Sequence, residues 1–527
     1  MNNRILIFFF CSMVFNCACK KSFLDVPIQG QGSPSTDPQV ANAEVTGAYN
    51  ALITPDPTQS EFGQYDIHGI YFITVTNIMS DDADKGSYPA DQPLAANIDN
   101  FQINSDNTYI SGLWRGYYAG ISRTNVAIQG LAQAALDPNL VTTRTAEMRF
   151  LRAYLYFNLV RMFGGVPLVL TVPTGPQKQD SAFYFRATVN DVYNKAIIPD
   201  LQFAVAHLPL KSATDVGRAT QGAAETLLAK VDLYLKNWEA ADSLSQDVIS
   251  SGQYQLVPDY SILWRQAGDN SAESVFEVET GIYGNADYGI PGYVEFQGAR
   301  QDNGMGTPFT LWNNPGFYQP AGDDGFGFDC PTADLMSAYE AGDLRKASTI
   351  IFLPASSPPD TLFDGFTIPT MIGIDARYNY KAYHSKILSG GGLPQIEVFT
   401  SNRGLCQKNL HILRYAEVLL IKAEAANELG NTGGAGGFLN QVRARAGLSA
   451  TTASSQSDMR TAIWNERRVE LAMEHDRFWD LVRQGRAAQV MIASGKTSFV
   501  AGVNELLPIP ASEIAVSGGR LSQNPGY

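Results

Sequence analysis

The sequence of 527 residues has little cysteine, little histidine and few charged side chains. It contains five Cys and five His, and Asp, Glu, Lys and Arg make up 17% of the chain, against roughly 25% in an average soluble protein. Lys and Arg number 38 and Asp and Glu number 52, so the net charge is −14. Binding to a phosphate backbone needs a basic surface, so this balance excludes general DNA or RNA binding.

Long apolar runs are also scarce. The most apolar stretch is residues 5–15 (ILIFFFCSMVF), which is shorter than the roughly 20 residues that a membrane-spanning helix needs and fits the core of a signal peptide. No transmembrane helix is expected. Residues 1–18 are therefore predicted to be a lipoprotein signal peptide that is absent from the mature fold.

Three of the five cysteines fall in the first 19 residues, and Cys19 follows the small residue Ala18. A small residue followed by cysteine is the cleavage pattern of a bacterial lipoprotein, so Cys19 is predicted to carry the lipid. Asn16 stands where Leu is usual, and ordinary secretion with cleavage nearby is the alternative, with Cys17 the weaker lipid acceptor. Whether Cys330 and Cys406 form a disulfide is left open.

Catalytic signatures are missing. No two histidines lie within five residues of each other, and no G-x-S-x-G motif occurs, which removes the usual zinc-protease and serine-hydrolase patterns. Gly495-Lys496-Thr497 resembles the end of a phosphate-binding loop that lacks its first glycine. We expect no catalytic residues, no enzyme activity and no cofactor, although 52 acidic residues leave a glycosidase pair of carboxylates untested.

One short segment resembles the start of a calcium loop. Asp82-Ala-Asp84-Lys-Gly86 places alternate carboxylates before a glycine but lacks the later ligands. No metal site is predicted, and calcium at Asp82 is left open beside a polar binding loop or a plain turn.

Helical periodicity runs through most of the chain. The expected helices are residues 40–52, 114–131, 144–163, 219–236, 239–250, 417–429 and 435–446. The last four form two helix pairs of the tetratricopeptide type, 192 residues apart. The sequence predicts a mainly α fold: a helix-pair scaffold at about 40–252 and 411–490, and a loop-rich insertion at about 253–410 with a few short strands such as 274–278.

The charged segment 466–480 has Glu466, Glu470, Glu474 and Arg477 at helical spacings of four and three. A charged active site is one interpretation. The favoured one is a salt-bridge network that ties this helix to its neighbours, joined by Arg443 and Arg445. The five tryptophans in or beside helices (Trp114, Trp238, Trp264, Trp464 and Trp479) are expected in the core.

Aromatic residues make up 11% of the chain, and many stand in loops rich in glycine and amides. A flat ring covers the apolar face of a sugar while amide and carboxylate groups bind its hydroxyl rim, so such loops are typical of glycan binding. Residues 81–101 and 283–328 fit this pattern; the alternative is packing within the loops. The candidate glycan-binding residues are Asp82, Tyr88, Asn97, Asn100, Tyr283, Tyr288, Trp312 and Tyr318.

Several stretches resemble the SusD/RagB family of outer-membrane nutrient-binding lipoproteins, in family order. They are CKKSFLDVP at 19–27, LWRGY at 113–117, FLRAY through FGGVP at 150–167, LRYAE at 413–417, NQVRARAG at 440–447, ERRVEL through RFWDL at 466–481, LPIP at 507–510 and QNPGY at 523–527.

This resemblance implies that residues 19–527 are one SusD-like domain with tetratricopeptide-like helix pairs and an irregular ligand-binding half. It also implies a lipid-anchored protein on the outer membrane, facing the cell exterior. Its function would be to capture oligosaccharides or polysaccharides and deliver them to a SusC-like TonB-dependent transporter. A peptide- or glycoprotein-binding lipoprotein of the same fold and a protein-interaction scaffold are the alternatives.

Overall fold

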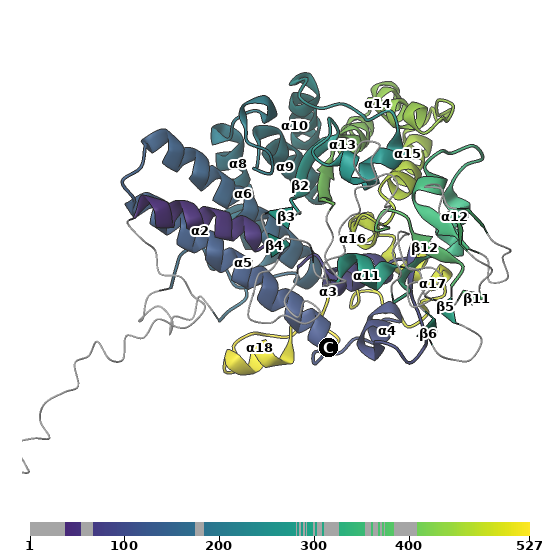
Figure 1. The fold of residues 1–527 in the computed structure, drawn as a ribbon, viewed down its shortest axis with the longest axis horizontal. Helices are drawn as coiled ribbons and strands as arrows, with labels where there is room; N and C mark the ends of the chain where they lie inside the picture. The colour runs from purple at the N-terminus through teal and green to yellow at the C-terminus, as the bar shows by residue number, and fades with distance from the viewer. Residues whose placement is uncertain are drawn as a thin grey trace, which may run out of the picture.

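The computed structural model describes residues 37–53, 67–173, 184–280, 326–353, 375–383 and 408–527, with short segments between 282 and 373. Helices dominate it, and a group of short helices and strands lies beside the C-terminal helices (Figure 1). The mainly α fold predicted from the sequence is confirmed. Within the described residues no helix is long and apolar enough to cross a membrane.

The helices of the N-terminal half come first. They are α2 (Pro38–Asn50), α3 (Ile70–Ile73), the π-helical η2 (Thr74–Ile78), α4 (Pro93–Asp99), α5 (Thr108–Gln133), α6 (Pro138–Phe163), α7 (Val189–Val192), the π-helical η5 (Tyr193–Ile197), α8 (Ile198–His207), η6 (Lys211–Ala213), α9 (Gln221–Leu235) and α10 (Trp238–Ser250). The remaining helices are η7 (Tyr260–Trp264), η8 (Gln266–Gly268), α11 (Tyr293–Gln297), α12 (Ala333–Ala338), η11 (Lys346–Ser348), α13 (Tyr415–Glu428), α14 (Thr432–Arg445), α15 (Gln456–Glu470), α16 (Arg477–Arg483), α17 (Ala487–Ala493) and α18 (Ala511–Val516).

The strands are short and pair antiparallel. The three longer pairs are β1 (Ala83–Gly86) with β7 (Phe328–Pro331), β2 (Ser274–Val278) with β13 (Leu410–Arg414), and β8 (Ile350–Phe352) with β12 (Arg377–Asn379). The others are β3 (Ile282–Tyr283) with β4 (Ala286–Asp287), β9 (Asp360–Thr361) with β10 (Thr367–Ile368), and β5 (Gln301–Asp302) between β6 (Pro308–Phe309) and β11 (Ile372–Gly373).

The long helices form one continuous stack. In the order α2, α5, α6, α8, α9, α10, α13, α14 and α15, each helix packs against the next. The two helix pairs α9–α10 and α13–α14 are therefore neighbours in space although the chain leaves after α10 and returns at β13 (Figure 1). The antiparallel pairing of β2 with β13 brings both ends of the intervening segment to one place.

Helix boundaries follow capping chemistry that periodicity alone did not show. Helix α6 begins at Pro138, six residues before the expected start, because the Asp137 carboxylate accepts hydrogen bonds from the amides of Asn139 and Leu140. It ends at Gly164, whose φ of 71° favours glycine. Helix α14 begins at Thr432 rather than 435, since the Asn431 side chain caps it.

The core lies along the inner helices of the stack. Helix α6 is buried on nearly every side along residues 146–163. Gly120 lets α5 approach α6 closely, because a Cβ atom there would lie 2.9 Å from Leu155 Cδ1. Among the expected core tryptophans, Trp114, Trp264 and Trp479 are buried. Trp238 and Trp464 are half-buried and pack at the edge of the stack.

Helix α9 offers a matched test of the junction between the two helix pairs. Leu233 is buried against Ala241 of α10 and Ile421 of α13, whereas Leu235 is 41% exposed. We expect Leu233→Ala to lower the unfolding free energy by about 2–4 kcal/mol and Leu235→Ala by about 0.5 kcal/mol or less. Urea unfolding of both variants measures this difference. Equal losses would contradict the packing of α9 against α13.

Candidate functional site

The charged segment 466–480 does not form the single helix that its spacing suggested. Helix α15 ends at Glu470, α16 begins at Arg477, and residues 471–476 form a turn in which Met473 and His475 have φ of 63° and 73°. The prediction of one helix was wrong, because side-chain spacing of three and four residues carries no signal for a turn stabilised by distant contacts. The predicted salt-bridge network is confirmed. The charged residues of segment 466–480 pair with three separate groups of partners.

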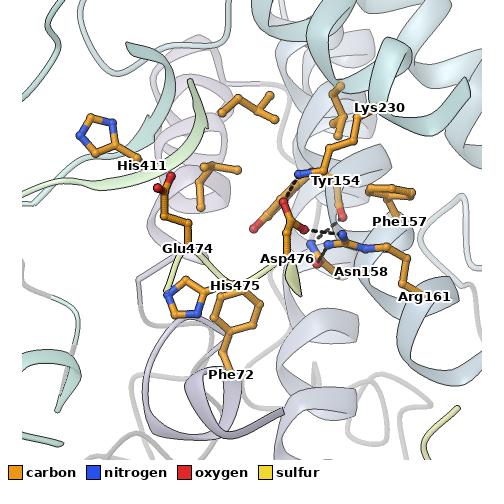
Figure 2. A pocket seen from close by; sticks show the side chains of 13 residues that line it. Phe72, Tyr154, Phe157, Asn158, Arg161, Lys230, His411, Glu474, His475 and Asp476 are labelled. Carbon is orange, nitrogen blue, oxygen red and sulfur yellow. Dashed lines mark hydrogen bonds and ion pairs between the residues drawn. The ribbon is translucent and has the colours of Figure 1, made fainter. Parts of the chain in front are cut away.

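The first group crosses the inner helices of the stack. Asp476 forms ion pairs with Arg161 of α6, at 2.8 Å, and with Lys230 of α9. Lys230 also contacts Glu417 of α13 at 3.0 Å, and Glu417 contacts Arg467 of α15 at 3.2 Å. Figure 2 shows Asp476 between Lys230 and Arg161. One chain of alternating charges therefore joins four helices and the 471–476 turn.

The second group surrounds Glu470. Its carboxylate contacts Arg345 at 2.9 Å, Arg414 of β13 at 3.0 Å, and Arg445 of α14. Burial by itself would raise the pKa of Glu470, but the three guanidinium groups outweigh it and hold that pKa well below its usual range. The partner Arg345 precedes η11, in the segment between β7 and β8, so this group joins the helix stack to the loop-rich region.

Two neighbouring arginines form the third group. Arg477 donates to both oxygens of Asp81, at 2.7 and 2.8 Å, and Arg468 donates to Asp82 at 2.8 Å. Asp81 and Asp82 lie between η2 and β1, at the start of the segment 81–101 that the sequence predicts to bind glycan. Asp82 is only 1% exposed. We therefore leave Asp82 out of the proposed binding surface, because its carboxylate is held inside the protein.

The space around this turn is too small for a ligand. The cavity in Figure 2 is lined by Tyr154, Lys230, His475 and Asp476, among others, and has a volume of about 30 Å³, which holds about one water molecule. Burial lowers the pKa of His475 to about 3, so its imidazole is neutral. The turn therefore belongs to the scaffold.

A wider polar cleft of about 420 Å³ lies between α12, α14 and α15. It is lined by Ala338, Glu340, Asp343, Arg443, Ser449, Ala450, Thr451, Thr452, Ala462, Asn465, Glu466 and Val469. None of these lining residues is aromatic, and Arg443 is already paired with Glu340 at 2.6 Å and Glu466 at 3.0 Å. The cleft therefore lacks the flat apolar platform that sugar stacking needs.

The loop after β1 is positioned by strand pairing and by α4. Strand β1 pairs with β7 in the register Ala83 to Pro331 and Gly86 to Phe328. Residues 89, 90, 92 and 93 are exposed at its turn. Gln92, with φ of 47°, accepts a hydrogen bond from the Tyr109 hydroxyl at 2.6 Å. The loop is thus held at one end by the pairing of β1 with β7 and at the other by the hydrogen bond between Gln92 and Tyr109.

Three candidate residues belong to this part of the chain: Tyr88 to the loop, Asn97 to α4, and Asn100 to the position that follows α4. Tyr88 and Asn97 are half-buried, and Asn100 is exposed, with its side-chain amide donating to the carbonyl of Ala96 at 2.9 Å. The other candidates cannot be placed from the described residues. Tyr283 lies in β3, where only the backbone is described, and Tyr288, Trp312, Tyr318, Cys19 and Cys406 lie outside the described residues. Cys330 is buried in β7.

Sequence reasoning missed two lysines that hold this loop, Lys85 and Lys496. In the sequence, Gly495-Lys496-Thr497 resembles the end of a phosphate-binding loop. In the structure, the buried Lys496 ammonium donates instead to the carbonyls of Ile78 and Ala83, at 2.5 and 3.2 Å. Among the described residues no group of three His, Cys, Asp or Glu side chains is placed to hold a metal ion.

One buried acid of the same region forms no ion pair with any cationic side chain of the described residues. Asp329 of β7 accepts a hydrogen bond from the Asn77 side chain at 3.0 Å. Burial raises its pKa to about 7. Asp329 and Glu470 are thus two buried carboxyl groups whose environments shift their pKa values in opposite directions.

Family models match both halves of the chain. The model described as "SusD family" matches residues 374–527, and the model described as "Starch-binding associating with outer membrane" matches residues 72–233. The chain belongs to the SusD/RagB family. The resemblance identified from the sequence motifs is therefore confirmed.

Curated relatives extend the SusD-like match over most of the length. The SusD-like protein P2 of Formosa agariphila is 27% identical over 454 residues, which cover 82% of this chain and 83% of that protein. A SusD-like protein of Bacteroides ovatus is 27% identical over 410 residues, which cover 72% and 67%.

Solved structures agree with the SusD-like fold. A protein described as a laminarin-binding SusD-like protein is 28% identical with a TM-score of 0.73, covering 93% of this chain and all of that one. The surface glycan-binding protein A from Bacteroides fluxus is 25% identical with a TM-score of 0.73, covering 94% and 100%. The helical scaffold with its loop-rich side is thus a shared SusD-like architecture.

The two buried carboxyl groups give a prediction in which the same substitution has opposite effects. Glu470→Gln removes one buried anion from three buried guanidinium groups, which keep only their other carboxylate partners, and we expect a loss of about 3–5 kcal/mol of unfolding free energy at pH 7. Asp329→Asn removes a carboxyl group that must ionise in a buried site above pH 7, and we expect a gain on the order of 2 kcal/mol at pH 8.

The pH dependence follows from the pKa directions. The pKa of Glu470 is lowered in the folded state, so its stabilisation is present above its unfolded value of 4.5 and is lost as the pH falls. The pKa of Asp329 is raised, so wild-type stability relative to Asp329→Asn falls as the pH rises from about 4 to about 7. Chemical unfolding at pH 3, 5 and 8 checks both signs: the difference between wild type and Glu470→Gln should shrink from pH 5 to pH 3, and the difference between Asp329→Asn and wild type should grow from pH 5 to pH 8. A destabilised Asp329→Asn at pH 8 would contradict the assignment.

Proposed function

We propose that this SusD-like protein is a cell-surface glycan-binding lipoprotein that captures oligosaccharides without cleaving them. The observation that carries the proposal is the 28% identity, over 93% of this chain, to a laminarin-binding SusD-like protein of the same fold. The loop between β1 and α4 is exposed at Pro89, Ala90 and Gln92 and is supported by buried ion pairs, so it offers an uncharged surface to a neutral ligand.

The proposed binding surface combines the 84–101 loop with the segment 283–328. Its residues are Tyr88, Asn97, Asn100, Tyr283, Tyr288, Trp312 and Tyr318. Aromatic rings would cover the apolar faces of the sugar and the amides would bind its hydroxyl groups. Such a site is built from stacking and neutral hydrogen bonds, which agrees with the low proportion of charge in the whole chain.

We further propose that the first 18 residues are a lipoprotein signal peptide and that Cys19 carries the lipid, which anchors the protein to the outer membrane facing the exterior. The mature chain from residue 19 onward would form one SusD-like domain that delivers its ligand to a SusC-like TonB-dependent transporter. A family model that describes association with the outer membrane supports this location.

Substitution of the loop aromatics tests the binding surface. A screen of the purified protein against a glycan panel that includes laminarin names the ligand, and titration calorimetry measures its affinity. We expect Tyr88→Ala and Trp312→Ala each to cost about 1–3 kcal/mol of binding free energy, since buried aromatic area is lost. Phe185→Ala is the control, because Phe185 is 50% exposed but lies outside both loops.

If neither loop substitution weakens binding, the surface is placed wrongly. Preferential binding of peptides or glycoproteins over glycans would instead support the alternative ligand class. Release of shortened glycan when the purified protein is incubated with a polysaccharide would show that the protein is a hydrolase.

The anchor is tested with two neighbouring cysteines. We expect Cys19→Ala to move the protein from the membrane fraction to the soluble fraction and to abolish incorporation of a labelled fatty acid. Cys17→Ala should leave both unchanged. The reverse pattern would assign the lipid to Cys17, and retention of the lipid in both variants would rule out the proposed modification.

A further inference from the structure

The ammonium group of Lys85 lies at the centre of the loop that follows β1. Its Nζ atom donates to three backbone carbonyls, those of Gly86 at 2.8 Å, Tyr88 at 2.9 Å and Asp91 at 3.1 Å. An ammonium group has three donor hydrogens, so these contacts use all of them. The loop therefore folds around a positive charge that the chain itself supplies.

This arrangement couples the shape of the loop to the lysine. Lys85 is 7% exposed, and a buried ammonium group is costly unless its hydrogen bonds are satisfied. The three carbonyls come from residues 86–91 and converge only when the loop keeps its observed path. Loss of that path would leave the ammonium group short of partners, so Lys85 favours a single loop conformation.

A second buried lysine fixes the base of the same loop. The amide of Lys85 donates to Asp99 Oδ2 at 3.0 Å, and Asp99 Oδ1 pairs with Lys496. Lys496 also donates to the carbonyls of Ile78 and Ala83. Through Asp99, the loop, α4 and the segment after α17 are held as one unit.

Ser87 and Asp375 fix the outer part of the loop. The Ser87 hydroxyl donates to Asp91 Oδ2 at 3.0 Å, and the Ser87 amide donates to Asp375 Oδ2 at 3.1 Å. Ser87 has φ of 56°, in the left-handed region that costs energy for a residue with a side chain. Contacts on both sides of the residue hold it in that conformation.

We propose that Lys85 is a positioning residue of the glycan-binding surface: its ammonium group orders residues 86–91, and with them Tyr88, before the glycan arrives. This inference rests on the proposed function. A loop that is already ordered does not lose its conformational freedom on binding, so the affinity is higher by the factor by which the competent conformation is populated.

Hydrogen exchange on the protein without ligand tests the ordering directly. In Lys85→Met, which keeps an unbranched apolar side chain and removes the ammonium group, we expect amides of residues 86–91 to exchange at least about tenfold faster. Lys195→Met is the matched control, because the Lys195 side chain is 64% exposed and lies in η5, away from the loop. It should leave exchange in residues 86–91 unchanged.

Binding of laminarin, or of the strongest glycan from the panel, tests the positioning role. We expect a Kd about 3–10-fold weaker for Lys85→Met, in line with a competent loop population reduced by that factor. Saturating glycan should restore slow exchange in residues 86–91. Exchange in the helix stack should match that of the wild type, whereas a general loss of stability would speed exchange throughout the chain. Lys195→Met should bind as the wild type does.

The results of these measurements distinguish a failure of the inference about Lys85 from a failure of the proposed function. Unchanged exchange in Lys85→Met overturns the inference, and faster exchange with unchanged affinity overturns the positioning role. A wild-type protein that binds no glycan counts against the proposed function, while the exchange measurement still decides whether Lys85 orders the loop. If Lys85→Met does not fold, Ser87→Ala, which removes the hydroxyl bond to Asp91, is measured in the same way and should give smaller changes in the same direction.

Discussion

The structure depends on pairing the buried charges of residues 466–480. Charges removed from water are unfavourable unless each meets an opposite charge in good geometry. Asp476 meets this requirement through the inner helices, Glu470 through β13, α14 and the segment between β7 and β8, and Arg468 and Arg477 through the two aspartates before β1. One short stretch of chain therefore fixes the helix stack, the loop-rich region and the candidate binding loop relative to one another.

The pairing of these buried charges accounts for where part of the chain's small number of charged residues is used. The charges of segment 466–480 are largely buried and paired, and the exposed residues at the turn of the β1–α4 loop, Pro89, Ala90, Gln92 and Pro93, carry no charge. The loop is supported from inside by two lysines that contact backbone carbonyls, and its outer part is held by the contacts of Ser87 with Asp91 and Asp375.

Much of the scaffold could be predicted from the sequence because its signal is local. The helical periodicity of residues 219–250 and 417–446 indicated the two helix pairs, and the charges at 466–480 indicated a network. The turn at Met473 to His475 could not be predicted, since its partners are more than 50 residues away along the chain. Lys85 and Lys496 were missed for a related reason: they contact backbone carbonyls, which carry no signal in the sequence. The sequence pattern of segment 81–101 predicted that Asp82 binds glycan, and only the structure shows its contact with Arg468.

A crystal structure of the protein with a glycan bound tests the account most directly, because it shows where the sugar lies and whether it is intact. The account predicts an intact oligosaccharide in contact with residues of the 84–101 loop and of the 283–328 segment, with the helix stack unchanged. A sugar bound in the cleft between α12, α14 and α15, or along the helix stack, would contradict it, as would a cleaved product.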